Sequence, residues 1–404
     1  MADVKFGVFG LWRGAEFVNI INNYDGATLV AVCDASQMRR DDVRNHCEKA
    51  GVLDHVTFYD NFDEFIEADM DVVFLCNSFN DHARFAIRAM EKGINVISEC
   101  ISGATLKECV DLCRTVERTG CKYMIAENYP FTNTRLEMAR LSHEGLLGKI
   151  LYVDGEYNHP SSSSELRYLT PQDSHWRAWY PRTYYITHSM GPLMYMSKSM
   201  PVKVNARAVH SEALKNVAPF RNNTDAITDI HCVTDTGAIF RFCGCNQTAS
   251  PSGYRIMGER GAAEMGRGVE NGKVLLTFNH WEVPEGYEQR QVYEPKKSEL
   301  ILKSEASGHG GADFFMIHNM VEAIKNDAPI FFDVYKGAAM SATAIYAWRS
   351  ILNDGATYYI PDFRNEEERK RIENDDLTPF PDADGKGNAV PASTAIAKEM
   401  GYNV

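Results

Sequence analysis

The sequence predicts an α/β fold in which a doubly wound parallel sheet is followed by an α+β domain with an open, mainly antiparallel sheet. Three observations carry this prediction. Short apolar runs alternate with amphipathic stretches over the first third of the 404 residues, which is typical of strand–helix–strand units. A glycine-containing turn joins the first apolar run to the first helical stretch. After about residue 129, alternating polar and apolar residues indicate strands with one buried face.

Buried parallel strands are expected where a short apolar run is bounded by turn residues. Five such runs precede residue 129: Lys5–Phe9, Thr28–Cys33, Asp71–Cys76, Asn95–Ser98 and Lys122–Ala126. Helical patterns lie between them at His82–Lys92 and Thr105–Arg118. The second helix begins with a capping box formed by Thr105 and Glu108 and ends at Gly120.

The second part of the chain combines strands with late helices. Its strands are expected at Lys149–His159, Asp229–Val233, Ala238–Cys243, Tyr254–Met257, Ala262–Met265 and Val274–Phe278. Helices are expected at Leu136–His143, Asp313–Lys325 and Gly337–Leu352, and a flexible loop at Ser161–Ser164. We therefore divide the chain into a first domain at 1–129, a substrate and oligomerisation domain at 130–362, and an extended arm at 363–404. In this division, the late helices of the second domain can pack back on the first domain.

Composition argues against several classes of partner. The net charge of −13 argues against nucleic acid, because nucleic-acid-binding proteins usually carry a basic stripe. No apolar run approaches the ~18 residues of a membrane span, and the first strand begins too early to leave room for a signal peptide, so we expect a cytoplasmic protein. The ten cysteines do not suggest a disulfide framework. Cys243-Gly-Cys245 lacks the second ligand pair of a zinc site, and no metal is expected.

A turn that opens a helix directly after the first strand predicts a dinucleotide site. The run Gly10-Leu11-Trp12-Arg13-Gly14-Ala15 matches the first and third positions of G-x-G-x-x-G/A, where backbone N–H groups approach a pyrophosphate. Trp12 stands where the second glycine is expected, and Gly14 can supply flexibility shortly after it. A plain strand–helix turn stays open as the alternative.

The ends of the later strands strengthen the prediction of a bound dinucleotide. Asp34 ends the second strand, where a carboxylate accepts hydrogen bonds from ribose hydroxyls and repels the 2′-phosphate of NADP. Asn77 and Glu99 also follow strands, at the edge where open α/β sheets bind ligands. These residues favour NAD, although Arg39 and Arg40 leave NADP open and Asp34 has the alternative of a turn residue.

A second group of polar residues predicts acid–base chemistry. In the strand at Lys149–His159, Tyr157 and His159 share one face because side chains two residues apart point the same way. Further along, Tyr185 and His188 are three residues apart, so a helix starting there would bring them together. Titratable side chains on shared faces are candidates for proton transfer, with Glu127 as the carboxylate of the group. An interior tyrosine and histidine bonded to backbone is the alternative for the strand pair.

Aromatic residues in the stretch 174–192 predict a wall for a sugar. Trp176 and Trp179 can stack on a pyranose, and Arg177 lies between them in sequence. An aromatic-rich core between domains is the alternative. Gly308-His309-Gly310-Gly311, which precedes a late helix, can hold a ligand through His309 or serve only as a helix entry.

With these residues in place, the chain resembles the Gfo/Idh/MocA oxidoreductases over roughly residues 4–360, and within them glycoside hydrolase family 109. The resemblance rests on the glycine turn and on spaced stretches: Asp81-His82-Ala83, Gly93–Glu99, Glu127-Asn128, Gly155–His159, Trp176-Arg177, Tyr185-x-Thr-His188-x-x-Gly-Pro192 and Gly308–Asp313. It implies tightly bound, recycled NAD, with His82 and Asn128 added to the cofactor contacts. It also implies a Rossmann fold for the first domain.

Two departures from the family pattern bear on function. Sugar dehydrogenases of this superfamily carry Glu-Lys-Pro after the fourth strand, whereas this chain has Glu99-Cys100-Ile101. The missing lysine favours the glycosidase branch, which also lacks it. The run from Thr183 to Gly191 differs from the branch's usual Gly-Asn-x-Tyr-Pro-Thr-His-Gly-Leu-Gly, which puts specificity for N-acetylgalactosamine in doubt.

The resemblance implies an NAD-dependent glycosidase that oxidises C3 of a sugar, removes the C2 proton, eliminates the C1 substituent, adds water and reduces C3 again. Tyr157, His159, Tyr185, His188 and Glu127 would carry the acid–base steps, and Trp176, Arg177, Trp179 and His309 would bind the glycoside. A glycoside 3-dehydrogenase that stops at the keto-sugar and a non-catalytic sugar-sensing regulator are the alternatives. We expect a small-molecule glycoside substrate and a homo-oligomer, a dimer or tetramer.

Overall fold

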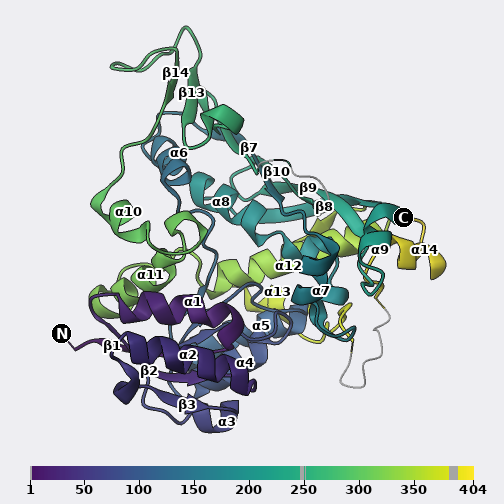
Figure 1. The fold of residues 1–404 in the computed structure, drawn as a ribbon. Helices are drawn as coiled ribbons and strands as arrows, with labels where there is room; N and C mark the ends of the chain where they lie inside the picture. Colours follow the sequence, from purple (N-terminus) through teal and green to yellow (C-terminus); the bar gives the residue numbers. More distant parts are fainter. Residues whose placement is uncertain (1, 246–249, 251, 382–389) are drawn as a thin grey trace. The chain divides into compact units, whose positions relative to one another are not determined.

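The structure, a computed structural model, describes every residue except 1, 246–249, 251 and 382–389 (Figure 1). It divides into two compact units. Unit 1 comprises Met1–Asn128, Leu300–Ala338 and Phe363–Asp375, and unit 2 comprises Tyr129–Glu299, Ala339–Asp362 and Asp376–Val404. Each unit is described on its own below.

The described part of unit 1 contains a six-stranded sheet in which every pair of neighbours is parallel. In spatial order its strands are β3 (Thr57–Tyr59), β2 (Ala27–Cys33), β1 (Val4–Phe9), β4 (Val72–Leu75), β5 (Asn95–Ser98) and β6 (Tyr123–Ile125). The order reverses direction between β1 and β4, which is the switch point at which doubly wound sheets bind ligands. The predicted Rossmann class is confirmed.

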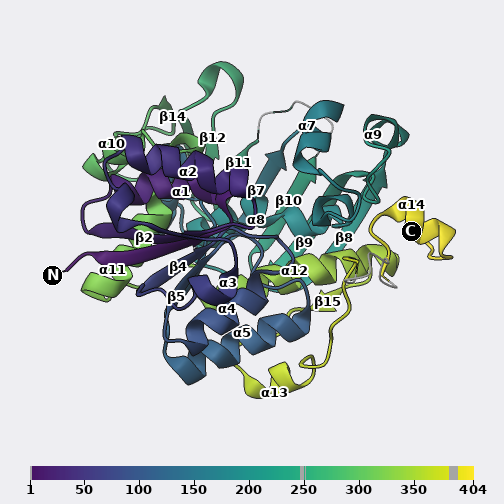
Figure 2. The same cartoon turned by 60° about the horizontal axis from the view of Figure 1, so that its bottom comes forward.

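Helices cover both faces of this sheet (Figure 2). The helices α1 (Leu11–Asn22) and α2 (Gln37–Lys49) lie on one side, and α4 (His82–Glu91) and α5 (Leu106–Thr119) lie on the other. Unit 1 also holds α3 (Phe62–Phe65), α11 (Phe314–Asn326) and α13 (Glu366–Lys370). The capping box predicted at Thr105 and Glu108 is confirmed, and Gly120 ends α5 with a φ of 71°.

Unit 2 is built on a nine-stranded sheet, counted over the residues that the structure describes. Its order is β14 (Arg290–Tyr293), β13 (Val274–Phe278), β12 (Gly261–Met265), β11 (Tyr254–Gly258), β7 (Ile150–Asn158), β10 (Ile239–Cys245), β9 (Asp225–Thr234), β8 (Pro201–His210) and β15 (Tyr358–Tyr359). Within this sheet β7 and β10 pair in parallel and the other neighbours are antiparallel. The predicted open, mainly antiparallel sheet is confirmed.

The central strand β7 alternates as its sequence predicts. Val153, Gly155 and Tyr157 are buried, while the residues between them are partly exposed. The helix α8 (Thr187–Ser197) packs on the buried face, and a Cβ added at Gly155 would lie only 2.5 Å from Leu193 Cδ1. The glycine therefore permits the close approach that brings α8 alongside Tyr157.

Other helices of unit 2 are α6 (Asn133–His143), α7 (Ser163–Leu169), α9 (Glu212–Val217) and α14 (Thr394–Glu399), whereas α10 (Glu299–Ser304) and α12 (Val334–Leu352) run from one unit's residues into the other's. The prediction of a flexible loop at Ser161–Ser164 is partly wrong, because Ser163 and Ser164 begin α7, whereas Ser161 and Ser162 precede it. Ser162 caps α7 through a capping box with Glu165, a local signal that the serine run obscured. None of the described helices is both long enough and apolar enough to cross a membrane.

The segment from residue 363 onward, which we expected to be an extended arm, is shared between the units. Phe363–Asp375 belongs to unit 1 and Asp376–Val404 to unit 2, with 382–389 outside the described residues. Within unit 2, the buried carboxylate of Asp225 accepts hydrogen bonds from the backbone N–H of Thr394 at 3.0 Å and from its hydroxyl at 2.5 Å. This carboxylate ties the start of α14 to β9.

We predict that Thr394→Val weakens this attachment, because it removes the hydroxyl donor and leaves a buried carboxylate less well bonded. The free energy of unfolding in urea should fall by about 1–3 kcal/mol, and amide hydrogen exchange of α14 should speed up. Thr394→Ser keeps the hydroxyl and is the matched control. Equal exchange rates in the two variants would contradict the role assigned to this hydrogen bond.

Candidate active site

The glycine turn of unit 1 is shaped by the backbone of a neighbouring strand end. Gly10 has a φ of 91°, which favours glycine, and a Cβ there would lie 2.5 Å from the carbonyl carbon and oxygen of Cys76. A Cβ at Gly14 would lie 2.6 Å from Val8 Cγ1, so this glycine lets α1 pack closely on β1. Trp12, at the expected second glycine, is 42% exposed and therefore does not block the turn.

Asp34 supports this turn from the end of β2. Its Oδ2 accepts a hydrogen bond from the backbone N–H of Leu11 at 2.7 Å, and its Oδ1 accepts one from Ser36 at 2.8 Å. Each carboxylate oxygen can accept more than one hydrogen bond. The same side chain can therefore hold the turn and still accept from a ribose hydroxyl, as the sequence predicted.

Two buried amide oxygens at strand ends have no hydrogen-bond partner among the described residues. They are Oδ1 of Asn77, after β4, and Oδ1 of Asn128, after β6. Buried polar atoms are nearly always bonded, so these two are suited to donors on a ligand. His82 is also buried: its Nδ1 lies 3.1 Å from the carbonyl oxygen of Ile101, whereas its Nε2 has no hydrogen-bond partner among the described residues, and burial lowers the pKa of its ring.

A network of charged groups joins the first turn of α1 to the start of α11. Arg13 donates two hydrogen bonds to the carboxylate of Asp313, at 2.7 and 2.9 Å, and a third to Glu99 at 2.9 Å. Asp313 also accepts from Asn128 Nδ2 at 2.6 Å and lies 2.9 Å from His309 Nδ1. Burial would raise the pKa of Asp313, but His309 and Arg13 outweigh it and hold that pKa well below its usual range.

This network changes the interpretation of three predicted ligand contacts. Arg13 and Glu99 pair with each other, and His309 is a member of unit 1 that contacts Asp313. Asp313 is the centre of the group. The sequence analysis included it in the Gly308–Asp313 stretch of the family resemblance but gave it no role.

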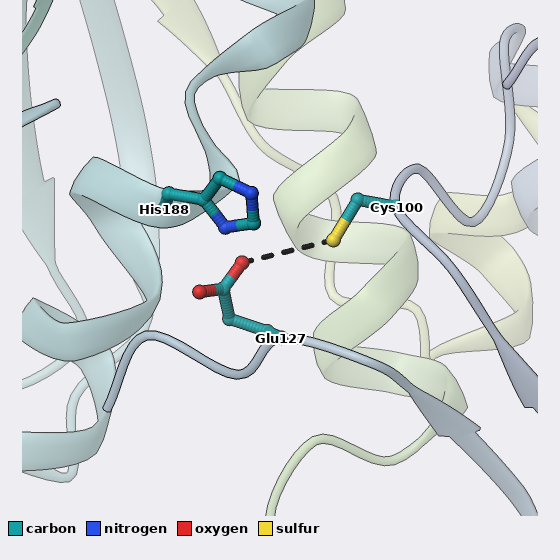
Figure 3. A group of neighbouring side chains, drawn as sticks. All are labelled: Cys100, Glu127 and His188. Atoms are coloured by element: carbon teal, nitrogen blue, oxygen red, sulfur yellow. Dashed lines mark hydrogen bonds between the residues drawn. The ribbon is translucent and has the colours of Figure 1, made fainter. Parts of the chain in front are cut away.

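Cys100 occupies the position where the sugar dehydrogenases carry a lysine. Figure 3 shows its thiol directed at the carboxylate of Glu127, with Sγ 3.7 Å from Oε2. Both side chains are buried. A thiol is a weak donor without a positive charge, so Cys100 does not supply the positive charge that a lysine at this position would supply.

The four predicted acid–base residues of unit 2 lie together. The ring of Tyr157 is 5.0 Å from the ring of His188, 5.9 Å from that of His159 and 6.0 Å from that of Tyr185. His188 projects from the first turn of α8 (Figure 3) and stacks at 4.4 Å on Tyr129, a residue that the sequence analysis missed. Tyr185 ends a 3₁₀ turn just before α8, so it reaches His188 from a neighbouring element rather than from the same helix.

The surroundings of Tyr157 and His159 shift the pKa values of these two side chains in opposite directions. Burial, reinforced by the neighbouring phenols of Tyr185 and Tyr129, raises the pKa of Tyr157 well above its ordinary value. Partial desolvation, followed by the charges of Arg182 and Arg177, lowers the pKa of His159. At neutral pH Tyr157 is therefore a proton donor and His159 a neutral base, which is a division suited to acid–base catalysis.

Behind these residues, Tyr180 lies among arginines. Its ring is 5.8 Å from that of Tyr185 and 5.6 Å from that of Trp176. Burial would raise the pKa of the Tyr180 phenol, but the charges of Arg221, Arg182 and Arg177 outweigh it and lower that pKa to about 8. Sequence reasoning missed Tyr180, Arg182 and Arg221 because their spacing carries no recognisable motif.

The predicted sugar wall is partly assembled. Trp176 and Arg177 lie in the 3₁₀ turn Trp176–Ala178, with the guanidinium carbon of Arg177 4.3 Å from the Trp176 ring centre and 5.8 Å from that of Tyr185. Trp179 donates its indole N–H to the carbonyl oxygen of Asp173 at 3.0 Å. Arg177 therefore adjoins the tyrosine–histidine cluster directly, and Trp176 lies beside Arg177.

Two family models match this chain. The model of an oxidoreductase family with an NAD-binding Rossmann fold matches residues 4–127. The model of the C-terminal domain of glycosyl hydrolase 109 matches residues 220–369. The chain therefore combines a Rossmann domain of the Gfo/Idh/MocA oxidoreductase type with a C-terminal domain of the glycosyl hydrolase 109 type.

Curated relatives agree with this assignment to the glycosyl hydrolase 109 type. A glycosyl hydrolase family 109 protein of Shewanella sp. (strain ANA-3) is 27% identical over 400 residues, which cover 90% of this chain and 85% of that protein. An α-N-acetylgalactosaminidase of Tannerella forsythia is 25% identical over 410 residues, covering 89% of this chain and 86% of the relative. The predicted enzyme class, an NAD-dependent glycosidase on an oxidoreductase fold, is confirmed at this level.

Solved structures share the fold of this glycosyl hydrolase 109-type chain. An oxidoreductase from Agrobacterium radiobacter in complex with NAD+, L-tartaric acid and magnesium superimposes with a TM-score of 0.70 at 13% identity, covering 89% of this chain and 99% of the other. A levoglucosan dehydrogenase in complex with NADH and L-sorbose also gives 0.70, at 16% identity, covering 90% and 100%. The Gly10 cradle, Asp34 and the unpaired amide oxygens of Asn77 and Asn128 fit the NAD of an NAD-binding Rossmann domain.

We predict that Gly10→Ala lowers the affinity for NADH by tenfold or more, about 1.4 kcal/mol, because the new Cβ displaces the Cys76 backbone that shapes the turn. Fluorescence titration of bound NADH measures this. Gly51→Ala is the matched control, since Gly51 also has a positive φ, of 71°, but open space around its Cβ. Equal losses in both variants would show that backbone strain, rather than the cradle, is responsible.

We predict that Tyr180 ionises near pH 8, so tyrosinate absorbance should show an early step that Tyr180→Phe removes and that the exposed-site variant Tyr168→Phe retains. A phenol whose pKa is lowered by folding stabilises the fold only when it is ionised. The free energy of unfolding of wild type relative to Tyr180→Phe should therefore rise by on the order of 2 kcal/mol between pH 8 and pH 10. A single tyrosine step near pH 10 would contradict the arginine cluster.

Proposed function

We propose that this NAD-dependent glycosidase cleaves its substrate through transient oxidation at C3 of the sugar, with NAD bound tightly and recycled in each turnover. The tyrosine–histidine cluster of unit 2 carries the proposal, because it supplies both a neutral base and a protonated phenol within one group of contacting rings. When bound, NAD would supply hydride transfer at C3, first away from the sugar and finally back to it.

Each step of the proposed cycle requires a particular proton transfer by residues of this chain. Oxidation at C3 requires a group that accepts the hydroxyl proton, and His188 or Tyr185 is proposed for this role. A ketone at C3 makes the C2 proton acidic, and His159, neutral at pH 7, is proposed to remove it while Tyr157 donates a hydrogen bond. The electron pair from the C2–H bond then forms the C1–C2 double bond as the C1–O bond breaks.

The remaining half of the cycle reverses these transfers. The leaving alkoxide takes a proton, for which Tyr157 and His159 are the proposed donors. Water then adds its oxygen to C1 and its proton to C2, and reduction at C3 restores the hydroxyl. Glu127, at the end of β6, is proposed to position or polarise one of the reacting groups. No oxocarbenium ion forms on this route, so either anomer can be a substrate.

The substrate is proposed to be a small glycoside, stacked on Trp176 and contacted by Arg177, with Trp179 and His309 as further proposed contacts. An N-acetylgalactosaminide is the first candidate to assay, because one relative is named for that activity. The departure of the run from Thr183 to Gly191 from the family pattern makes a wider panel of sugars necessary. A homo-oligomer and a cytoplasmic location are proposed with it.

The deciding experiment measures the release of nitrophenol from a panel of nitrophenyl α- and β-glycosides in heavy water. The sugar product is analysed by mass spectrometry. We predict one deuterium at C2 of the product and no net NADH. His159→Asn should lower kcat roughly 10²–10⁴-fold, as expected for loss of a general base, and the exposed-site control His280→Asn should leave it unchanged.

The dependence of activity on pH gives a second test of the role assigned to His159. Because the pKa of His159 is lowered, wild-type kcat/KM should stay high below the ordinary histidine range and fall only at more acidic pH. NAD+ consumed in proportion to product would favour the 3-dehydrogenase. No cleavage and no C2 exchange with any sugar would overturn the proposed mechanism.

A further inference from the structure

Two arginines of unit 2 are buried and have no carboxylate partner in the part of the chain that the structure describes. Arg182 is 1% exposed and Arg221 is 6% exposed, and Nε of each has no hydrogen-bond partner within that part. Among the residues that the structure describes, neither guanidinium forms an ion pair. By contrast, buried Arg369 contacts Glu117 at 2.8 Å and Glu366 at 2.9 Å, and Arg13 pairs with Asp313 and Glu99.

The fold makes room for the guanidinium of Arg182 and holds it in place. A Cβ at Gly244 of β10 would lie 3.0 Å from its Nε and 3.1 Å from its Nη2. Its Nη2 donates a hydrogen bond to the carbonyl oxygen of Tyr157 at 3.5 Å, and its guanidinium carbon is 5.9 Å from the ring centres of Tyr157 and Tyr185. This cation therefore adjoins the proposed catalytic group.

Arg221 is brought to the same place by a fixed loop. The backbone N–H groups of Asn222 and Asn223 both donate to the carbonyl oxygen of Ala178, at 2.7 and 3.0 Å. The guanidinium carbon of Arg221 lies 5.5 Å from the ring centre of Tyr180, whose phenol it bonds. Below pH 8 that phenol is neutral, so it provides no counter-charge for the two arginines at neutral pH.

Burying cations without a partner costs several kcal/mol each, whereas an oxyanion bonded by arginine recovers much of that cost. We propose that Arg182 and Arg221 bind an anionic substituent of the sugar substrate, a carboxylate or a sulfate or phosphate ester. The inference rests on the proposed function for the identity of the ligand as a glycoside. It makes the preferred substrate an acidic sugar rather than a neutral one.

Binding measurements test this without requiring turnover. The NAD-loaded protein is titrated in a calorimeter with galacturonate, glucuronate and galactose 6-sulfate, and with neutral galactose and glucose. Wild type should bind at least one acidic sugar roughly tenfold or more tightly than its neutral parent, which is about 1.4 kcal/mol, because only the acidic sugar forms a charge-assisted hydrogen bond with the arginines. The carboxylate and ester arms distinguish the two kinds of anion.

Arg221→Gln should reduce this preference to within about threefold, and Arg221→Lys, which keeps the charge but not the planar fork, should retain part of it. Arg207→Gln, which removes an exposed arginine of β8, should change nothing. Urea unfolding and NADH affinity show that the variants are folded. Equal binding of acidic and neutral sugars by wild type, or an unchanged preference in Arg221→Gln, would overturn the proposal.

Two further outcomes separate this inference from the proposed function. Acidic sugars that bind through Arg221 but undergo no cleavage and no C2 exchange would leave the anion site standing and remove the glycosidase mechanism. Cleavage of neutral glycosides, with acidic sugars binding no better than neutral ones, would support the glycosidase mechanism and remove the anion site. Inorganic sulfate that binds as tightly as the acidic sugars would show an anion site unrelated to the substrate, and would overturn the assignment.

Discussion

The NAD-binding unit depends on one buried carboxylate. Asp313 has no exposed surface, yet it accepts a bidentate pair of hydrogen bonds from Arg13, one from Asn128, and a contact from His309. An uncompensated buried charge would be strongly destabilising, so its partners must stay in place. Because Arg13 lies in the first turn of α1, Asn128 follows β6 and Asp313 precedes α11, this one group fixes the start of α11 against the glycine turn. The turn that Asp34 supports from the other side is therefore held in a shape suited to a pyrophosphate.

Unit 2 solves a different problem, which is to keep several titratable rings together in different protonation states. The close packing of α8 on Gly155 buries Tyr157 and keeps its phenol protonated, while partial burial and then arginine charge lower the pKa of His159 and keep its ring neutral. The same positive charge lowers the pKa of Tyr180. The arginines thus act on the reacting groups through space, in addition to the anion site proposed for them. A thiol in place of lysine at Cys100 is consistent with chemistry that relies on these rings rather than on an ammonium group.

Local sequence patterns predicted many of the strands, helices and candidate site residues. They could not predict contacts between residues that lie far apart in the sequence. The two-residue period of β7 placed Tyr157 and His159 on one face, and the Thr105 capping box located α5, because both signals lie within a few residues. Asp313 and Arg13 are separated by 300 positions, and no local pattern marks such a pair. Arg182 and Arg221 look like surface charges in sequence, although both are buried. The strand β8 was missed because Lys203, Asn205 and Arg207 interrupt its apolar residues, and Ser162 was taken for part of a loop although it caps α7.

The central claim is that hydride leaves C3 of the sugar and returns to it while the glycosidic bond breaks. A glycoside carrying deuterium at C3, turned over by the NAD-loaded protein, tests this directly. The account predicts a slower reaction than with the unlabelled sugar, deuterium retained at C3 of the released sugar, and a transient signal of reduced cofactor that decays without net accumulation. Equal rates together with no transient reduced cofactor would contradict the account, because cleavage would then proceed without oxidation at C3.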